Sequence, residues 1–438
     1  MQKYYLSCII KELIIDIYNK NNNDNHLDNK KNNTYEYIIQ SVDDIIAVHI
    51  NFMKKNRIKI DNNMNKLPDL YWIPKMHKKI PKERYIAASN KCTTKLLSTI
   101  ITQCLKLVTN QHRRWCSTIE RTTGVNRMWI IDNSTKVLDA IQTYNENKNI
   151  KNIYSYDFST LYTNIPHKDF KKQIKWVLDK AFNDNNRNKI YIDKYTYKAQ
   201  WNERKNAYII NKAKLFKYIS FLIDNIYIKV ANNIYRQCIG IPMGTDCAPF
   251  LANLYLYALE WEYIDGISKK NIYLARKFSN CFRYIDDLLS FNNFKIIDKC
   301  KSKMYPKELV LNSENVSFDK CSFLDIDMNI INDKLHTNLY DKRDDFKFSI
   351  NNYPRLSANV HDKRTHNIII SQLIRDSNVC SDVKDFIIKS RLLIIKLSRQ
   401  SFNLDLLKSR FSLFYNKYYN LIEKYNYSKQ SLIISIFP

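Results

Sequence analysis

The sequence predicts an α+β fold, in which short strands and longer helices alternate over most of the chain. The 438 residues exceed what one small core needs, so two or three packed lobes are expected. Apolar residues make up 45% of the chain, which suffices to fill such cores. Apolar–polar alternation predicts a strand at 153–158 and paired strands at 281–291 and 322–340. Helical spacing predicts helices at 92–116, 168–182, 214–230 and 247–263, and over about the last 60 residues.

The order of these elements suggests three regions. Residues 1–66 form an N-terminal extension, in which 1–19 have the spacing of a short amphipathic helix. Residues 20–33 are nearly all Asn, Asp and Lys, a composition that predicts a solvated linker. Residues 67–345 are expected to fold together, with the Tyr- and Lys-rich stretch 190–212 as a protruding hairpin. Residues 346–438 form a third, helical region.

The charge of the chain gives a first indication of its partners. Lys and Arg number 70 against 43 Asp and Glu, so the formal net charge is +27. A surplus of this size attracts polyanions, of which nucleic acid is the most common. An alternative stays open, because an AT-rich coding sequence raises Lys, Asn, Ile and Tyr together, and this chain is rich in all four. The 31 Tyr residues also offer rings that can stack on bases.

The cysteines and the apolar runs indicate the compartment. The ten cysteines show no CxxC spacing, and none stands with a His at the spacing of zinc ligands. In a chain of this length they predict free thiols in a reducing compartment. No run approaches the roughly 20 apolar residues that a membrane span needs, and the N-terminus lacks the pattern of a signal peptide. We therefore expect an intracellular protein without membrane contact.

Two adjacent carboxylates, Asp286 and Asp287, stand in the middle of the apolar, strand-forming stretch FRYIDDLLSF at 282–291. Burying such charges is costly unless a cation neutralises them. At the tip of a tight hairpin, the pair would offer oxygen ligands to a hard divalent ion such as Mg²⁺. The alternative is a polar hairpin turn at the surface, and the pattern alone does not decide between the two.

A third carboxylate, Asp157, ends the strand predicted at 153–158. Phosphoryl transfer from a nucleoside triphosphate requires metal ions that bridge the attacking hydroxyl and the leaving phosphate. Placed opposite Asp286 and Asp287, Asp157 would complete a clamp for such ions. The alternative for Asp157 is a turn residue that terminates a strand.

Two of the four glycines in the chain, Gly240 and Gly244, fall within five residues. Glycine permits positive φ angles and a close backbone approach to a ligand. The helix predicted at 247–263 follows, and we expect Thr245 or Asp246 to cap its N-terminus beside the site. The alternative is an ordinary loop followed by a capped helix.

In this order, the strand with Asp157, the glycine turn with its helix and the Tyr-x-Asp-Asp hairpin resemble the reverse transcriptases. Four segments are similar to the Penelope-like retroelement branch of that family: WIPKMHK at 72–78, DFSTLYTNIP at 157–166, GIPMGT at 240–245 and FLD at 323–325. The resemblance spans about residues 67–375. It implies a right-hand polymerase fold. The fingers and a palm built on an antiparallel sheet backed by helices would lie at 67–345, and a helical thumb at 346–438.

The resemblance also implies a role for each matching residue. Asp157, Asp286 and Asp287 would be the catalytic carboxylates and would bind two Mg²⁺ or Mn²⁺ ions, together with the backbone carbonyl of Phe158. Tyr162 matches the aromatic residue under the incoming sugar, whose bulk excludes a 2′-hydroxyl and favours deoxynucleotides. Further dNTP contacts would come from Lys75, Arg84, Met243 and Gly244, and the primer end would be positioned by Phe323 and Leu324.

Alternatives stay open for these supporting residues. Arg84 suits bidentate phosphate contact, but Arg84, Lys75 and the nearby Lys78 also fit a solvated basic stretch. The segment around Phe323 also fits one more hairpin. Four C-terminal cations are expected either to follow a duplex backbone as part of the thumb or to form a solvated helix face: Arg391, Lys396, Arg399 and Arg410.

The expected function is that of an RNA-directed DNA polymerase of a retrotransposable element, which adds dNTPs to a primer 3′-hydroxyl. Its expected partners are an RNA template, a DNA primer, their duplex and dNTPs; no protein partner is predictable, and the expected location is the nucleus. Complete Penelope-like elements often carry a C-terminal GIY-YIG endonuclease, and this sequence shows no such motif. Two rivals stay open: an RNA-synthesising polymerase, against which Tyr162 argues, and a catalytically inactive, retroelement-derived nucleic-acid-binding protein.

Overall fold

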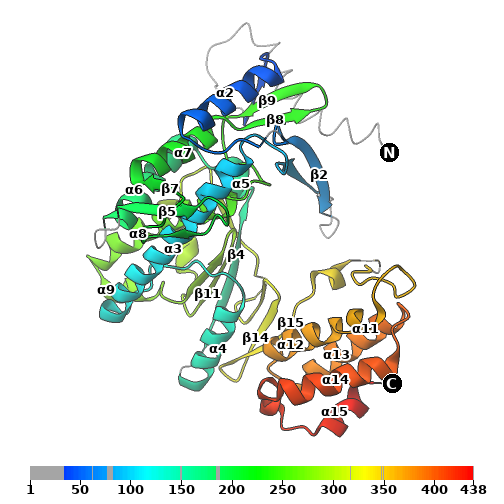
Figure 1. Ribbon diagram of the computed structural model, residues 1–438. Coiled ribbons are helices and arrows are strands. Elements are labelled where there is room, and N and C mark those ends of the chain that lie inside the picture. The colour runs from blue at the N-terminus through cyan, green and yellow to red at the C-terminus, as the bar shows by residue number, and fades with distance from the viewer. Residues whose placement is uncertain are drawn as a thin grey trace, which may run out of the picture.

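A five-stranded sheet, a four-stranded sheet and a C-terminal group of helices follow one another from the top to the lower right of Figure 1. The computed structural model describes residues 34–437 except 62, 76–81, 148–149, 184–187, 316, 347 and 349. The helix predicted at 1–19 and the linker predicted at 20–33 lie outside the described residues. The combination of helices with antiparallel sheets confirms the predicted α+β class.

The five-stranded sheet has the strand order β1-β9-β8-β2-β3. Its strands β2 and β3 form an antiparallel hairpin, and β1 pairs with β9. Helix α2 packs Ile45 against Ile234 of β9, and its Phe52 stacks on Phe221 of α7 (Lys212–Asp224) with 3.6 Å between ring centroids. The bounds are β1 Tyr35–Ile38, α2 Val42–Lys55, β2 Asp69–Lys75, β3 Lys82–Ala88, β8 Tyr227–Val230 and β9 Asn233–Gln237.

The four-stranded sheet, β10-β11-β4-β12, is antiparallel throughout and lies in the middle of the molecule. Its two faces contact different cores because side chains alternate along a strand. Tyr156 and Phe158 of β4 belong to a large core shared with the helices, whereas Ile153 belongs to a second core shared with the C-terminal region. Leu288 and Leu289 of β11 divide in the same way. The bounds are β4 Ile153–Ser159, β10 Cys281–Tyr284, β11 Asp287–Phe291 and β12 Val310–Ser313.

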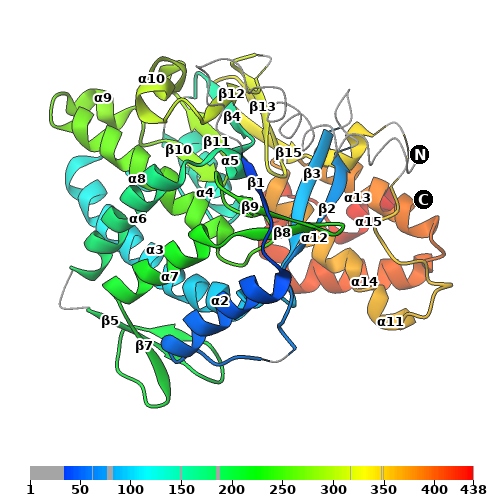
Figure 2. The ribbon, with the colours of Figure 1, turned by 90° about the horizontal axis from the view of Figure 1, so that it is seen from above.

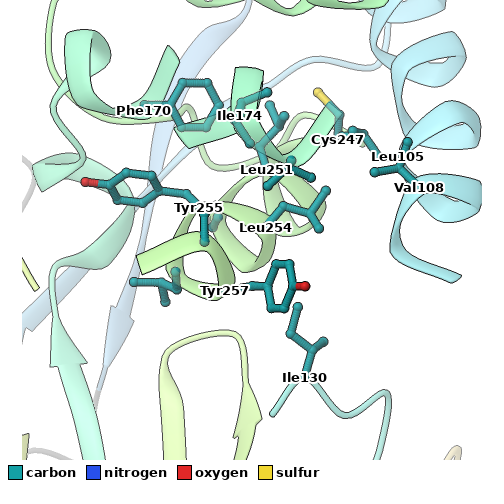
Figure 3. Packing of buried hydrophobic residues seen from close by; sticks show 14 of the residues in the cluster. Leu105, Val108, Ile130, Phe170, Ile174, Cys247, Leu251, Leu254, Tyr255 and Tyr257 are labelled. Atoms are coloured by element: carbon teal, nitrogen blue, oxygen red, sulfur yellow. The ribbon is translucent and has the colours of Figure 1, made fainter. Parts of the chain in front are cut away.

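The large core is built around helix α8, which is apolar on all sides. This pattern is typical of a helix buried within a core rather than of one at a surface. Leu251, Leu254 and Tyr257 of α8 are fully buried, with Phe170 of α6 on one side and Val108 of α3 on the other (Figure 3). The helices of this region are α3 Lys95–Thr123, α4 Thr135–Asn147, α5 Leu161–Asn164, α6 His167–Phe182, α8 Ala248–Ser268, α9 Ile272–Arg276 and α10 Ile296–Met304.

Between α6 and α7 the chain forms a small sheet, β6-β5-β7, which protrudes from the body at the lower left of Figure 2. Its strands are β5 Lys189–Asp193, β6 Ala199–Gln200 and β7 Ala207–Asn211, which confirms the hairpin predicted at 190–212. Asp193 closes the first turn by accepting hydrogen bonds from the backbone amides of Thr196 at 2.6 Å and Tyr195 at 3.0 Å. These contacts, the Thr196 amide foremost, lower the pKa of Asp193 to about 2.

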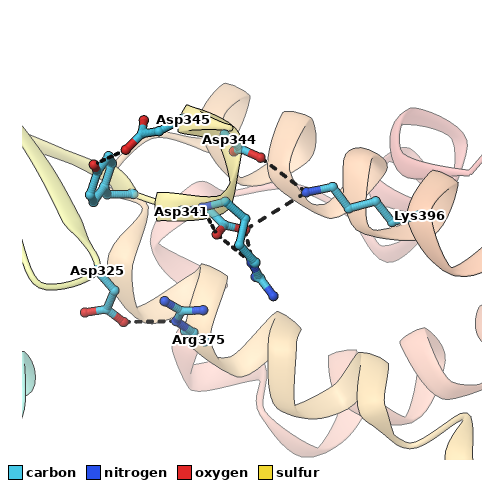
Figure 4. Close-up of polar contacts among 8 residues, drawn as sticks. Asp325, Asp341, Asp344, Asp345, Arg375 and Lys396 are labelled. Atoms are coloured by element: carbon cyan, nitrogen blue, oxygen red, sulfur yellow. Dashed lines mark hydrogen bonds and ion pairs between the residues drawn. The ribbon is translucent and has the colours of Figure 1, made fainter. Parts of the chain in front are cut away.

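The C-terminal region joins the sheet β13-β14-β15 to a group of helices, which share the second hydrophobic core. Ion pairs tie the sheet to the helices (Figure 4): Asp325 contacts Arg375 of α12 at 2.9 Å, and Asp344 contacts Lys396 of α13 at 3.3 Å. None of the helices in the described part of the chain has both the length and the apolar character that crossing a bilayer requires. The bounds are β13 Lys320–Phe323, β14 Ile326–Ile331, β15 Lys334–Leu339, η1 Lys342–Asp345, α11 Asp362–Thr365, α12 Ile368–Val379, α13 Val383–Ser398, α14 Leu404–Lys417, η2 Tyr419–Leu421, η3 Glu423–Tyr425 and α15 Lys429–Ile436.

Side-chain caps explain where several helices begin. Ser41, Asn211 and Asp382 each accept a hydrogen bond from a backbone amide in the first turn of α2, α7 and α13, respectively. Such caps satisfy amides that have no partner within the helix. The helix predicted at 214–230 ends earlier than expected, at Asp224, and the last four residues of the predicted range form β8.

The predicted cap of α8 is wrong. This helix begins after Cys247, and no side chain caps its first turn. The carboxylate of Asp246 is instead engaged by α3, where Lys95 contacts it at 2.6 Å and the Thr99 hydroxyl donates to it at 2.9 Å. The hydroxyl of Thr245 donates to the carbonyl of Pro242 at 3.3 Å within the preceding turn. A tertiary contact therefore engages Asp246 and a local turn engages Thr245, so neither side chain caps the helix.

Candidate active site

Asp157 and Asp287 pair directly with each other in the central sheet, because β4 and β11 run antiparallel in that register. Directly paired residues have Cα atoms about 4.5–5.5 Å apart and place their side chains on the same face. That face also carries Ile153 and Leu289, which belong to the C-terminal core. The two carboxylates therefore lie on the face of the sheet that packs, through Ile153 and Leu289, against the C-terminal region.

Asp286 lies at the tip of the hairpin that joins β10 to β11. The turn of two residues is tight because Ile285 adopts a left-handed conformation, with φ of +57°. A β-branched residue in this region carries backbone strain, so the surrounding contacts must hold the turn in place. One such contact comes from β4, where the backbone amide of Phe158 donates to the Asp286 carbonyl at 3.2 Å. Asp286 thereby lies beside the end of the strand that carries Asp157.

The three carboxylates are close enough to repel one another. Burial, followed by the charges of Asp286 and Asp157, raises the pKa of Asp287 to about 7. Lys342 opposes this shift and Glu314 adds to it, so both side chains lie near the carboxylates. Carboxylates that are held together in this way favour the binding of a cation, which relieves the repulsion.

The donor set fits an ion that is shared with a substrate. Mg²⁺ is usually bound through one or two carboxylates and completes its shell with water and substrate phosphates, rather than within an all-protein cage. Within the described ranges, no three His, Cys, Asp or Glu side chains lie together as a ready-made metal site, and this includes the three aspartates. Asp157, Asp286 and Asp287 offer carboxylate oxygens, and the Phe158 carbonyl lies next to Asp157 on β4. Their role as metal ligands stays a prediction.

A buried ion pair supports the hairpin from the side of the helices. Arg283 of β10 and Glu260 of α8 have side chains that are 0% and 1% exposed, and Arg283 Nε lies 2.6 Å from Glu260 Oε1. A second guanidinium nitrogen donates to Asn253 Oδ1 at 2.7 Å and to the carbonyl of Ile285 at 3.1 Å. The hydroxyl of Tyr305 donates to Glu260 at 3.0 Å. The network thus connects α8 to the residue immediately before Asp286.

The glycine turn lies between α5 and β3. Gly240 has φ of +90°, and a Cβ at this position would collide with the backbone carbonyl of Tyr162. Gly244 has φ of +107°, and a Cβ there would collide with the carbonyl of Ala87 in β3. Backbone hydrogen bonds accompany both approaches, since the Ile241 amide donates to Tyr162 at 2.6 Å and the Ala87 amide donates to Met243 at 2.9 Å. Only glycine allows backbones this close, so the turn holds the one-turn helix with Tyr162 and the strand that carries Arg84.

Tyr162 lies near Asp286, and Arg84 lies near Tyr162. Burial raises the pKa of Tyr162, the charge of Asp286 raises it further, and the charge of Arg84 lowers it. Arg84 is exposed on β3 and pairs there with Ile73 of β2. Of the residues that we expect to contact the dNTP, Tyr162 therefore lies beside Asp286, and Arg84 lies near Tyr162 although it comes from a different sheet.

The remaining predicted residues are distributed around this group. Lys75 ends β2, but its side chain lies outside the described residues, as does the whole of Lys78. Phe323 is buried at the end of β13, and Leu324 follows in the turn with φ of +54°. The segment before β13 is tied to β4, because the amide of Ile153 donates to the carbonyl of Phe318 at 2.8 Å. The structure thus brings this hairpin next to the central sheet, and its role toward a primer stays a prediction.

The C-terminal cations occupy different environments. Arg391 and Arg399 are exposed on or next to α13, whereas Arg410 of α14 is half-buried. Lys396 is engaged by Asp344 and, at 4.0 Å, by Asp341 (Figure 4). Within the described residues, Arg391 and Arg399 make no ion pair and are the two of the four whose charges are available to a partner.

Comparison with known proteins identifies the shape of the molecule. No family model and no curated protein matches the sequence. The structure of telomerase from Candida albicans, in complex with the TWJ fragment of telomeric RNA, matches with a TM-score of 0.56 at 11% identity, covering 92% of this chain and 70% of that chain. Apo telomerase from Candida tropicalis gives 0.45 at 13% identity, over 92% and 67% of the two chains. The RNA-dependent RNA polymerase 3Dpol of Sicinivirus gives 0.36 at 11% identity, over 67% and 54%.

The first of these matches covers nearly the whole chain, and it shows that the protein has the right-hand polymerase fold. This confirms the predicted fold class. The assignment of the five-stranded sheet to the fingers, of the four-stranded sheet with its helices to the palm, and of the C-terminal helices to the thumb stays a prediction. The candidate site lies on the four-stranded sheet, at the end nearest to the glycine turn.

Proposed function

We propose that this protein is a reverse transcriptase, an RNA-directed DNA polymerase that extends a primer by nucleotidyl transfer. The observation that carries the proposal is the direct pairing of Asp157 with Asp287 on the palm sheet of a right-hand polymerase fold, with Asp286 at the adjoining turn. Carboxylates from separate strands, held together against their repulsion, are what two-metal catalysis of phosphoryl transfer requires. The Tyr-x-Asp-Asp hairpin and the glycine turn add the resemblance to reverse transcriptases.

Each group around the site has a part in the proposed reaction. Bound by Asp157, Asp286 and Asp287, two Mg²⁺ ions would lower the pKa of the primer 3′-hydroxyl and neutralise charge on the leaving pyrophosphate. Arg84, exposed on β3 near Tyr162, would present a planar guanidinium to the triphosphate. Lys342 adds positive charge close to Asp287. The reacting groups are thereby oriented before chemistry begins, which contributes to the rate by itself.

Tyr162 supports deoxynucleotides as substrates. Its ring is half-buried beside Asp286, and the hydrogen bond from the Ile241 amide prevents its backbone from moving away. A ribonucleotide site needs room and a polar partner for the 2′-hydroxyl, which this ring does not offer. Replacing Tyr162 with Ala is expected to raise kcat/KM for NTPs relative to dNTPs, measured on one template–primer. An unchanged ratio would contradict the assigned role.

An RNA template and a retroelement origin are the finer parts of the proposal. The net charge of +27 suits a nucleic-acid partner, and the similar telomerase of Candida albicans was solved with an RNA fragment. The segments at 72–78, 157–166, 240–245 and 323–325 support the Penelope-like branch. An intracellular, nuclear location goes with such an origin.

The deciding experiment is primer extension on an RNA template, with dNTPs and either Mg²⁺ or Mn²⁺. We expect template-dependent extension by the parent protein and none by Asp286→Ala, although the variant should bind the template–primer with unchanged affinity. Equal incorporation by both proteins would refute the assignment of the site. Extension with NTPs but not dNTPs would favour the RNA-synthesising rival, and binding without any extension would favour the inactive one.

A further inference from the structure

A group of cations lies on the side of the molecule away from the carboxylates. Arg57 and Lys59 follow α2, Lys194 lies in the turn after β5, and Lys214 and Lys217 lie on α7. We name these five residues the α2–α7 patch. Figure 2 shows the end of α2, α7 and the β5–β7 sheet toward the lower left, whereas β4, β10 and β11 lie toward the top.

Contacts among the three elements bring the patch together. The backbone amide of Lys59 donates to the hydroxyl of Tyr208 in β7 at 3.4 Å, and Lys194 Nζ lies 5.7 Å from the centroid of the same ring. Lys214 Nζ donates to the carbonyl of Ile209 at 3.1 Å, so this side chain also turns toward β7. The patch is therefore centred on the junction of α2, β7 and α7.

The remaining two cations lie on the other side of Lys214. Lys217 Nζ donates to Asn56 Oδ1 at 3.3 Å and lies over the ring of Phe52, 5.6 Å from its centroid. Burial lowers the pKa of Lys214, and the charges of Lys217 and Arg57 lower it further. These three cations are thus close enough to repel one another, although Arg57 follows α2 and the two lysines lie on α7.

The patch keeps its positive charge among the described residues. Within the described ranges, none of its five residues makes an ion pair. Asp193, the acidic residue next to Lys194 in the chain, is already paired with Arg204 at 2.7 Å. Asp61 lies near Tyr197: burial, then Tyr208, then Asp61 raise the pKa of that tyrosine. One carboxylate at this position still leaves the five cations of the patch with an excess of positive charge. Like charges gathered without counter-ions favour a partner that carries several negative charges.

We propose that the α2–α7 patch binds the sugar-phosphate backbone of the RNA on which the protein acts, at a segment that is not being copied. This inference rests on the proposed function for the identity of the RNA, but not for the binding. An RNA strand fits better than an acidic protein surface, because Tyr195 is 81% exposed next to Lys194 and offers a ring on which a base can stack. Since the elements that carry the patch lie apart from the strands that carry the carboxylates (Figure 2), its contacts would add affinity without occupying the site of synthesis.

The test uses the full chain and a charge-neutral variant, Arg57→Gln with Lys214→Gln and Lys217→Gln. The probe is a primer-free single-stranded RNA of about 40 nucleotides, several times the length that one protein groove covers. Each phosphate contact to a single strand contributes about 0.7 to the slope of log K against log salt, so losing three should reduce the slope by about 2. The affinity should fall at least about tenfold at 0.1 M salt, by the same relation. Extension of a short template–primer should not change.

The control removes the same charge elsewhere, by Lys168→Gln, Lys172→Gln and Lys175→Gln on the exposed side of α6. Thermal melting and circular dichroism verify that both variants are folded. An equal loss of affinity in the control, or an unchanged salt slope in the patch variant, would overturn the proposal. So would preferential binding of polyglutamate to the parent patch. If the parent extends no primer but the slopes differ as expected, the patch is supported and the polymerase proposal fails independently.

Discussion

Replacing Arg283 with Met separates the stability of the palm from the placement of its hairpin. The substitution roughly keeps the volume of the buried side chain but leaves the Glu260 carboxylate buried without its cation, with the Tyr305 hydroxyl still donating to it at 3.0 Å. Removing one partner of a buried ion pair costs about 3–5 kcal/mol, because a buried charge is left uncompensated. The change also removes the hydrogen bond of 3.1 Å to the Ile285 carbonyl, which restrains the strained turn before Asp286.

The double variant, Arg283→Met with Glu260→Leu, shows which of these effects matters for synthesis. Replacing both charges by apolar groups of similar size is often neutral or stabilising, so most of the lost stability should return. In both variants, the Ile285 carbonyl in the turn before Asp286 lacks the hydrogen bond from the Arg283 guanidinium. A misplacement of about 1 Å can cost about 100-fold in rate, so we expect a fall in kcat of that order in both.

The assays are urea unfolding at constant pH and single-nucleotide extension at saturating dNTP. The expected result is a midpoint of unfolding that recovers in the double variant and a kcat that does not. If kcat recovers together with the midpoint, the ion pair only stabilises the palm, and a positioning role for Arg283 is refuted.

Three further predictions follow from the geometry. Gly240→Ala should destabilise the protein by more than about 1 kcal/mol and lower kcat/KM for dNTPs, because the added Cβ would displace the backbone of Tyr162. As a control, Gly266→Ala has open space around it and should be neutral or stabilising in the same urea assay. Burial lowers the pKa of His112 to about 4, below its value in the unfolded chain. Its contribution to stability is therefore present above pH 6.5 and is lost as the pH falls toward 4. In the His112→Gln variant, the melting temperature should depend less on pH over that range. The pKa of Asp287 is raised to about 7, so in EDTA its ionisation should lower the melting temperature as the pH rises from about 4 to 7. Adding Mg²⁺ should restore the melting temperature at pH 8. The Asp287→Asn variant should show neither effect.

The parts of the site that the sequence predicts are those whose residue types are unusual where they stand. Two adjacent aspartates in an apolar stretch and two glycines in a chain with four are such cases, and the structure brings both close to Tyr162. Their positions follow from local chemistry, because a tight turn or a backbone contact limits the residues that fit.

Residues whose importance depends on tertiary packing were not predictable in this way. Arg283 and Glu260 are 23 positions apart, and nothing in either segment indicates that α8 passes behind β10. Lys342 reaches Asp287 only because the C-terminal sheet brings η1 there. The failed cap prediction has the same origin, since Asp246 finds a stronger partner in Lys95 than in the helix that follows it.

The pairing of Asp157 with Asp287 makes the grouping of the candidate carboxylates depend on strand length. An insertion or deletion of one residue in β11 would exchange its two faces and turn the carboxylate toward the side that Leu288 now occupies against the helices. Length variation among natural variants should therefore be confined to connections such as the turn between β5 and β6. The stretch from Phe282 to Phe291 should tolerate substitutions at several positions but no change in the number of residues.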